Sequence, residues 1–302
     1  MFKFDTEQKV FDIGGVKIGG QPGQYPTAMI GSIFYHGDKA VLDEKNGTFN
    51  KEKIEALIQQ AAEISEKTGN PNIIDVVGAW PDALVKYIDF VVDKTDSPFL
   101  IDGTTPEVRV AGIKHVKEVG LTDRALYNTI MPGYRQDEIN ALGEFSVKSA
   151  ILLTFNPKMP TIGGRLEVLK DLVKVAEEAH VEKPIVDTAI LDVPDPGPAA
   201  KTIFLVKKTY GLPAGCGVHN AIDRWHQRKK MDPTRYHMSS AVAFTSTIMM
   251  GANFLLYGPL SKAPQVFPTI ALADAYVAYS MRQEYGIGPA VKNHPLTRIF
   301  TL

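Results

Sequence analysis

Eight short apolar stretches recur along the chain, and each is followed by a turn and then by a segment with helical spacing. This alternation predicts parallel strands joined by helices, because two consecutive parallel strands need a crossover of about a dozen or more residues between them. The predicted strands span residues 28–34, 72–77, 98–102, 124–128, 149–154, 183–187, 212–217 and 253–257. The predicted helices span residues 51–68, 81–94, 107–119, 136–145, 164–180, 197–210, a region ending near residue 251, and 264–285.

Eight strand–helix units in 302 residues predict an α/β fold, a (β/α)8 or TIM barrel that forms one domain over residues 1–302. An open doubly wound sheet is the alternative, and it is disfavoured because no predicted strand leads through a G-x-G-x-x-G turn into a helix. Residues 9–20 alternate around Gly14 and Gly15 and predict a β-hairpin within an N-terminal entry segment, residues 1–27. We expect this hairpin to cap the N-terminal mouth of the barrel.

The composition is that of a folded protein with almost no net charge. Lys and Arg number 33 against 34 Asp and Glu, so the chain lacks the basic surface that duplex nucleic acid requires. Its single cysteine, Cys216, excludes an internal disulfide framework and a cysteine-based zinc site. The N-terminal residues contain no apolar signal-peptide core, and no apolar run reaches ~18 residues. These features predict a cytoplasmic chain without a membrane span.

Short carboxylate, amide and hydroxyl side chains stand where several predicted strands end. They are Asp102, Asn128, Thr154 with Asn156, Asp187, and His219 with Asn220 beyond the seventh strand. Functional residues of a (β/α)8 barrel lie at the carboxyl ends of its strands, so these side chains would meet at one rim. Each of them could instead cap a helix or turn the chain. Their recurrence on several strands favours a ligand site, because unsatisfied buried polar groups are costly.

Other kinds of chemistry have weaker support. The seven histidines form neither H-x-H nor H-E-x-x-H, so we predict no metal site. Nothing marks Cys216 as a thiolate, no G-x-S-x-G elbow is present, and Lys183 begins a strand instead of ending one. Gly215, Gly217 and Gly258 would leave room for a phosphate or let a large flat ligand approach the backbone.

Several motifs resemble the H subunit of tetrahydromethanopterin S-methyltransferase. The most specific are GGQPGQYPTA at residues 19–28 and GVHN at residues 217–220, with shorter matches at 87–90, 99–102 and 256–259. The resemblance runs from the first residue to about Pro259, and it is closest to the bacterial stand-alone methylcobamide:tetrahydrofolate methyltransferases. The chain is more distantly similar to the methyltetrahydrofolate–corrinoid methyltransferases and to the pterin-binding barrel of cobalamin-dependent methionine synthase.

The resemblance implies methyl transfer between N5 of a reduced pterin, bound at the carboxyl-terminal mouth, and the cobalt of a cobamide. A corrinoid-binding partner protein would carry the methylcobamide, and the chain is expected to form a homodimer. The expected reaction is methylcobamide plus tetrahydrofolate to methyltetrahydrofolate, with tetrahydromethanopterin as the alternative pterin. The implied site consists of Asn220 as catalytic residue, of Asp102, Asn128, Asp187, Asn220 and Gly215 as pterin-binding residues, and of Thr154, Asn156 and His219 as further candidates.

The chemistry of a pterin is compatible with these residues. Its N3–H and 2-amino groups form a donor pair that one carboxylate can accept. A methylated N5 leaves poorly unless it is protonated or strongly hydrogen-bonded, and Asn220 could orient a water or stabilise protonated N5. The chain lacks a D-x-H-x-x-G cobamide signature, so we expect the cobamide on a separate carrier. A metal-free barrel lyase or aldolase and a non-catalytic pterin-binding subunit remain the alternatives.

Overall fold

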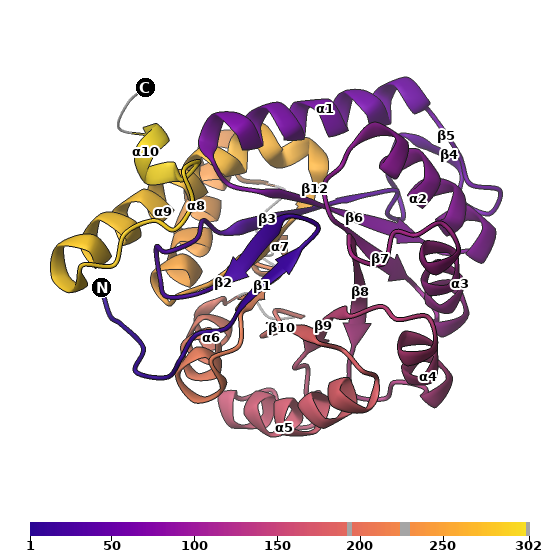
Figure 1. Cartoon of the computed structure of the whole chain (residues 1–302). Helices are drawn as coiled ribbons and strands as arrows, with labels where there is room; N and C mark the ends of the chain where they lie inside the picture. The colour runs from indigo at the N-terminus through magenta and orange to yellow at the C-terminus, as the bar shows by residue number, and fades with distance from the viewer. Residues whose placement is uncertain (192–194, 224–229, 300–302) are drawn as a thin grey trace.

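Eight parallel strands close into a barrel in the computed structural model, which describes residues 1–191, 195–223 and 230–299 (Figure 1). Strands that are consecutive around the barrel are also consecutive along the chain, and the last strand pairs with the first. The strands are β3 (Ala28–Ile33), β6 (Asn72–Gly78), β7 (Phe99–Gly103), β8 (Ala125–Ile130), β9 (Ser149–Leu153), β10 (Lys183–Asp187), β11 (Ala214–Cys216) and β12 (Phe254–Pro259). The predicted barrel is confirmed, and the open sheet is excluded.

Helices surround the barrel, and their ends follow the capping signals in the sequence. Asn50 caps the first helix by accepting a hydrogen bond from Lys53 N at 2.8 Å, and Gly69 ends that helix in the left-handed conformation. The outer helices are α1 (Lys51–Thr68), α2 (Pro81–Lys94), α3 (Pro106–Glu118), α4 (Gln136–Glu144), α5 (Ile162–Glu178), α6 (Gly197–Tyr210), α8 (Pro233–Met249) and α9 (Ala263–Tyr285).

Several short elements were not predicted separately. The strands β4 (Val41–Asp43) and β5 (Thr48–Phe49) form a small hairpin, and the chain also contains α7 (His219–Asp223), η2 (Leu260–Lys262) and α10 (Pro295–Ile299). The helical region predicted to end near residue 251 therefore comprises α7 and α8. In the described part of the chain, no helix is long and apolar enough to cross a membrane.

The strand residues alternate between two apolar cores. Side chains such as Ile74, Ile101 and Tyr127 face outward and pack with the helices. The intervening side chains, such as Ile73 and Leu100, face the barrel interior and form a second cluster with Leu126, Ile151, Ile185 and Phe254. This two-residue alternation decides which strand residues can reach a ligand inside the barrel.

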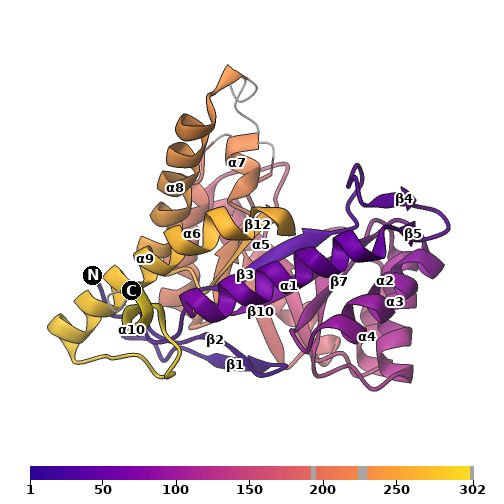
Figure 2. The ribbon, with the colours of Figure 1, turned by 90° about the horizontal axis from the view of Figure 1, so that it is seen from above.

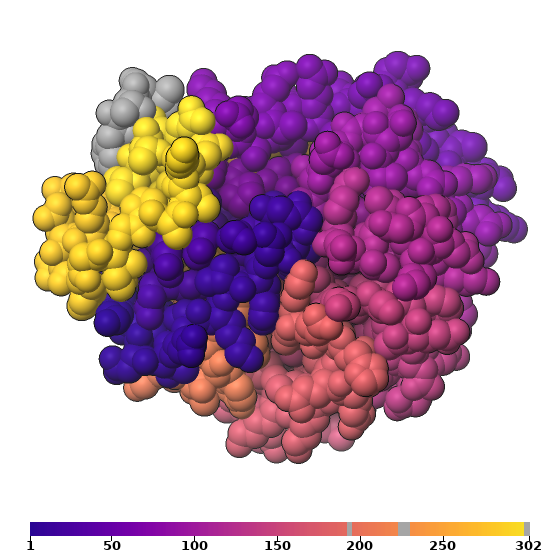
Figure 3. Space-filling model, viewed as in Figure 1, coloured from indigo at the N-terminus to yellow at the C-terminus, as the bar shows by residue number. Residues whose placement is uncertain are grey.

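A β-hairpin made of β1 (Val10–Ile13) and β2 (Val16–Gly19) closes the N-terminal mouth, as predicted. Ile13 and Ile18 are fully buried in the inner cluster, against the first residues of the barrel strands. Figure 3 shows the indigo N-terminal segment covering this mouth. Figure 2 shows the hairpin at the opposite end of the barrel from α7. We therefore expect ligands to enter from the carboxyl-terminal mouth.

The GGQPGQYPTA motif has a structural explanation at this closed end. Lys207 is fully buried on α6, and its Nζ donates to the carbonyl of Gly20 at 2.9 Å and to Asn253 Oδ1 at 2.6 Å. Thr27 donates from its backbone N and its Oγ1 to the buried carboxyl of Asp274 at 2.8 and 2.7 Å. Burial lowers the pKa of Lys207 to about 7. The motif thus joins the entry segment to α6, to Asn253 just before β12, and to α9.

The packing of the hairpin generates the first prediction. Ile18→Ala removes a fully buried side chain from the inner cluster, and we expect it to lower the free energy of unfolding by about 2–5 kcal/mol. Val10→Ala is the matched control, because Val10 lies on the same hairpin and is 37% exposed. Urea denaturation followed by circular dichroism measures both variants. Equal stability of the two variants would contradict a hairpin that is part of the core.

Candidate functional site

A layer of polar side chains lies inside the barrel, next to the apolar inner cluster on the side of the carboxyl-terminal mouth. Each member follows an inward-facing apolar residue by two positions, so it also faces the interior. Asp75 follows Ile73 in this way, and Asp102 follows Leu100. The layer consists of Ser32 on β3, Asp75 on β6, Asp102 on β7, Asn128 on β8 and Asp187 on β10. Three carboxyl groups therefore gather in the open mouth.

Asp75 and Asp102 form a carboxyl pair on adjacent strands. Ser32 Oγ donates to Asp75 Oδ2 at 2.6 Å. The amide of Asn128, which is paired with Asp102 in the register of β7 and β8, favours the ionised form of both carboxyls. Burial raises the pKa of Asp75 to about 6. Burial, and next the charge of Asp75, hold the pKa of Asp102 well above its usual range. The structure thus brings the predicted residues Asp102 and Asn128 together around a third residue, Asp75.

Asp187 belongs to a separate group at the end of β10. Its Oδ1 accepts from Ala189 N at 2.8 Å, and burial raises its pKa to about 7 despite this hydrogen bond. Arg165 is only 6% exposed, and its guanidinium favours the charged form of the Asp187 carboxylate and donates to the carbonyl of Ala189 at 3.2 Å. Arg165 Nη1 has no partner among the described residues. Buried carboxyls of this kind are candidates for ligand binding.

Asn220 lies in α7, just after the end of β11. Its backbone N donates to the carbonyl of Gly217 at 3.2 Å, and its half-buried side chain has no hydrogen-bond partner in the described part of the chain. A Cβ at Gly217 would lie 3.1 Å from Asn220 Nδ2, so the glycine leaves room for this amide. His219 is turned toward β12, because its Nδ1 lies 3.1 Å from the carbonyl oxygen of Leu256. Of these two residues, Asn220 is the better placed to bind a ligand through its side chain.

The remaining candidates have contacts within the protein. Thr154 is fully buried, and its N and Oγ1 both donate to the carbonyl of Asp187, at 2.9 and 3.2 Å. Asn156 Oδ1 accepts from the backbone N of Lys158 and Met159. A Cβ at Gly215 would lie 2.0 Å from the carbonyl oxygen of Phe254, so close strand packing requires this glycine. These contacts explain the three residues without a ligand.

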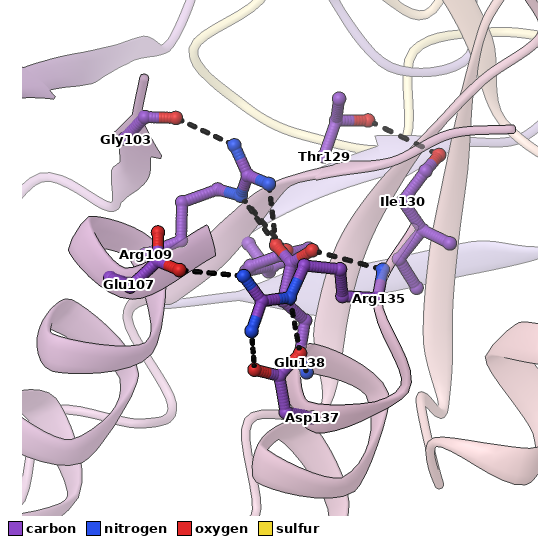
Figure 4. A network of polar contacts seen from close by, with 9 residues as sticks. Gly103, Glu107, Arg109, Thr129, Ile130, Arg135, Asp137 and Glu138 are labelled. Carbon is purple, nitrogen blue, oxygen red and sulfur yellow. Dashed lines mark hydrogen bonds and ion pairs between the residues drawn. The ribbon is translucent and has the colours of Figure 1, made fainter. Parts of the chain in front are cut away.

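An ionic network supports β7 and β8 from outside the barrel (Figure 4). Arg109 on α3 donates to Glu138 on α4 at 2.5 Å and to the carbonyl of Gly103 at 2.7 Å. The Tyr127 hydroxyl, on β8, donates to the same Glu138 carboxylate. Arg135 extends the network and binds Glu107 at 2.6 Å. The network joins α3 and α4 to the two strands that carry Asp102 and Asn128.

The sequence prediction missed Asp75 because it considered the ends of the strands. Asp75 lies in the middle of the NIIDVVG segment, where it is the only charged residue. Its position two residues after Ile73 could have indicated that it faces the barrel interior, since residues two apart on a strand point to the same side of the sheet. Arg165 was missed as well, because its helix gave no sign of which face points to the site. Among the described residues, no group of three or more His, Cys, Asp and Glu is arranged to hold a metal ion.

The fold and this site define a (β/α)8 barrel with a buried, carboxyl-lined mouth. A family model described as the tetrahydromethanopterin S-methyltransferase MtrH subunit matches residues 6–290. The chain is 40% identical to the H subunit of tetrahydromethanopterin S-methyltransferase from Methanothermobacter thermautotrophicus, over 99% of this chain and 100% of that protein. It is 38% identical to the protein of the same name from Methanocaldococcus jannaschii, with the same coverage. The chain therefore belongs to the MtrH family.

Solved structures of low sequence identity share the fold. Dihydropteroate synthase from Yersinia pestis superposes with a TM-score of 0.61 at 13% identity, over 89% of this chain and 99% of that one. Dihydropteroate synthase from Xanthomonas albilineans, solved with 4-aminobenzoic acid, gives a TM-score of 0.60 at 16% identity, over 93% and 100% of the two chains. These similarities support the barrel architecture.

The raised pKa of Asp187 predicts a pH-dependent contribution to stability. Between the ordinary aspartate pKa of 3.8 and the folded value of about 7, the unfolded chain releases a proton that the folded protein keeps. The contribution of Asp187 to stability therefore falls as pH rises through this window. Asp187→Asn should gain stability relative to the wild type from about pH 4 to about pH 7, and then the difference should stay constant. Urea unfolding of both proteins at a series of pH values measures this difference. A stability difference between Asp187→Asn and the wild type that does not change with pH would contradict the prediction.

Proposed function

We propose that this protein transfers a methyl group between a corrinoid and N5 of a reduced pterin. The observation that carries the proposal is the layer of buried carboxyl and amide groups at the open mouth of the barrel, in a member of the MtrH family. A reduced pterin is a flat ring whose edge carries neighbouring N–H donors. Buried carboxyls that lack such donors are unfavourable, so a ring of this kind would satisfy them.

Asp102 and Asp187 are the proposed acceptors for the pterin ring. They stand on different strands of the same inner layer, with Asn128 beside Asp102. A carboxylate can accept the N3–H and 2-amino groups together, which gives both orientation and affinity. Gly215 is also proposed to line the pterin site, although close strand packing already requires a glycine at this position.

Asn220 is the proposed residue near N5. Its amide has no partner among the described residues and lies at the same end of the barrel as the carboxyl layer. An amide cannot supply a proton at neutral pH, but it can hold a water or stabilise a charged N5 by hydrogen bonding. The corrinoid, when bound, supplies the metal centre that donates or accepts the methyl group. Holding the ring in a fixed orientation beneath that centre is the contribution of this chain.

The identity of the pterin is part of the proposal. The relatives reported above are named for tetrahydromethanopterin, and this favours tetrahydromethanopterin over the tetrahydrofolate predicted from the sequence. The preference for tetrahydrofolate, and with it a place among the bacterial stand-alone enzymes, remains a prediction that substrate assays decide. The corrinoid-binding partner, the homodimer and the cytoplasmic location likewise remain proposals.

The decisive experiment mixes the protein with methylcobalamin and with each reduced pterin while the corrinoid absorption spectrum is followed. Demethylation that depends on both protein and pterin supports the function, and the faster pterin identifies the substrate. A methylated corrinoid protein should give a higher kcat/KM than free methylcobalamin, because docking positions the cobalt. Pterin binding without any turnover would favour a non-catalytic role. A lysine trapped by borohydride would favour an aldolase.

Removal of either proposed acceptor should weaken pterin binding. Asp102→Ala and Asp187→Ala each leave ring donors unpaired, which costs about 1–3 kcal/mol of binding free energy. Both variants should fold, because both residues face the open mouth. Pterin dissociation constants from fluorescence quenching measure the effect, with circular dichroism as the folding control. Unchanged affinity in both variants would contradict the assignment of the site.

Loss of the Asn220 amide should affect the reaction more than binding. The charge on N5 differs between the bound substrate and the transition state, so a contact to N5 stabilises the latter preferentially. We expect Asn220→Ala to lower the single-turnover rate by a larger factor than it raises the pterin dissociation constant. Asn156→Ala is the matched control, because Asn156 bonds to its own loop. Equal changes in rate and affinity would limit Asn220 to binding.

A further inference from the structure

Asp75 is a buried carboxyl that neither the sequence prediction nor the proposed reaction uses. It lies in the middle of β6, and only 3% of its surface is exposed. Its Oδ2 accepts from Ser32 Oγ at 2.6 Å, whereas its Oδ1 is buried without a hydrogen-bond partner among the described residues. A buried carboxylate oxygen without a donor is unfavourable, so this position needs a further explanation.

The groups around Asp75 come from four elements. β3 contributes the Ser32 hydroxyl, β7 contributes the Asp102 carboxyl, and β8 contributes the Asn128 amide. Arg109 on α3 favours the charged form of Asp102. Arg109 is bound to Glu138, Tyr127 and the carbonyl of Gly103. Its charge is therefore largely balanced by Glu138 on the outer side of the barrel wall.

Asp75 and Asp102 face the barrel interior from adjacent strands, two register positions apart. Two such carboxyl groups cannot both be ionised at low cost, because like charges repel strongly where water is excluded. We propose that Asp75 and Asp102 hold one proton between them at neutral pH, and that Asp75 is the positioning residue that presents Asp102 to the ligand as a hydrogen-bond acceptor. Since Oδ2 already accepts from Ser32, Oδ1 of Asp75 is available for the shared proton. The protonation equilibrium belongs to the pair and not to either residue.

The shared proton has a consequence for ligand recognition. The pair carries one negative charge in place of two, which suits an uncharged ring with two adjacent N–H donors. When such a ring donates to Asp102, it lowers the pKa of that carboxyl, and the proton moves toward Asp75. No proton has to leave the buried site when the ligand binds. This part of the inference rests on the proposed pterin-binding function, whereas the protonation of the pair does not.

The protonation of the pair can be measured without any ligand. Carboxyl 13C chemical shifts of aspartate-labelled protein, followed from about pH 4 to about pH 9, report each titration. The wild type should keep one proton on the pair at pH 7, and Asp75→Asn should lower the pH at which Asp102 loses its proton, because no neighbouring carboxylate then opposes the ionisation of Asp102. Ser32→Ala should shift the titration of the pair to higher pH, because Ser32 stabilises ionised Asp75. Asp187→Asn is the matched control, and it should leave the titration of the pair unchanged.

Two outcomes would overturn the proposal. One is a wild-type pair that is fully ionised below pH 7, and the other is a titration of Asp102 that is unchanged in Asp75→Asn. Binding of 6-methyltetrahydropterin across the same pH range then tests the positioning role. Asp75→Asn should change how the dissociation constant depends on pH. If Asp75 had only a structural role, its replacement would change the dissociation constant by the same factor at every pH. Failure of any pterin to bind the wild type would contradict the proposed function and leave the titration result intact.

Discussion

Burial of carboxyl groups inside a closed barrel is the constraint on which the functional end of this protein depends. Asp75, Asp102 and Asp187 face the interior from three strands, and burial is the largest cause of the raised pKa of each. Such groups reduce the stability of the folded chain at neutral pH. Proteins keep unfavourable buried polar groups mainly where a ligand or a reaction needs them. Together with Asp75 Oδ1, which has no hydrogen-bond partner among the described residues, this cost supports the mouth of the barrel as the proposed site.

The opposite end of the barrel is closed and packed with apolar side chains. The hairpin places Ile13 and Ile18 against the inner apolar cluster, so the lower barrel is filled with side chains. Lys207 and Asp274 tie the entry segment to the surrounding helices through buried hydrogen bonds. Behind the site, Arg109 and Glu138 brace β7 and β8. The protein thus separates a packed, closed end from a polar, open end, as barrel enzymes commonly do.

The motifs that carry the family resemblance lie at both ends of the barrel. The GGQPGQYPTA motif, which made the family recognisable, lies at the closed end and holds the entry segment in place. The GVHN motif contains Asn220 at the open end, whereas the proposed acceptors Asp102 and Asp187 are single positions on separate strands. Identity of 40% along the whole chain establishes the family, whereas the dihydropteroate synthases share the barrel at 13–16%. The proposed pterin chemistry therefore rests on the family and on the carboxyl layer together.

The eight strand–helix units, the capping hairpin and the candidates Asp102, Asn128 and Asp187 could all be predicted from the amino-acid order, because periodicity and strand ends are local properties of the chain. Asp75 could not be singled out in this way, since its neighbours in sequence are apolar. Its position beside Asp102 on the adjacent strand, and the internal hydrogen bonds of Thr154 and Asn156, became evident only in the folded barrel. Contacts between strands depend on register and burial, which arise only when distant segments pack together and exclude water.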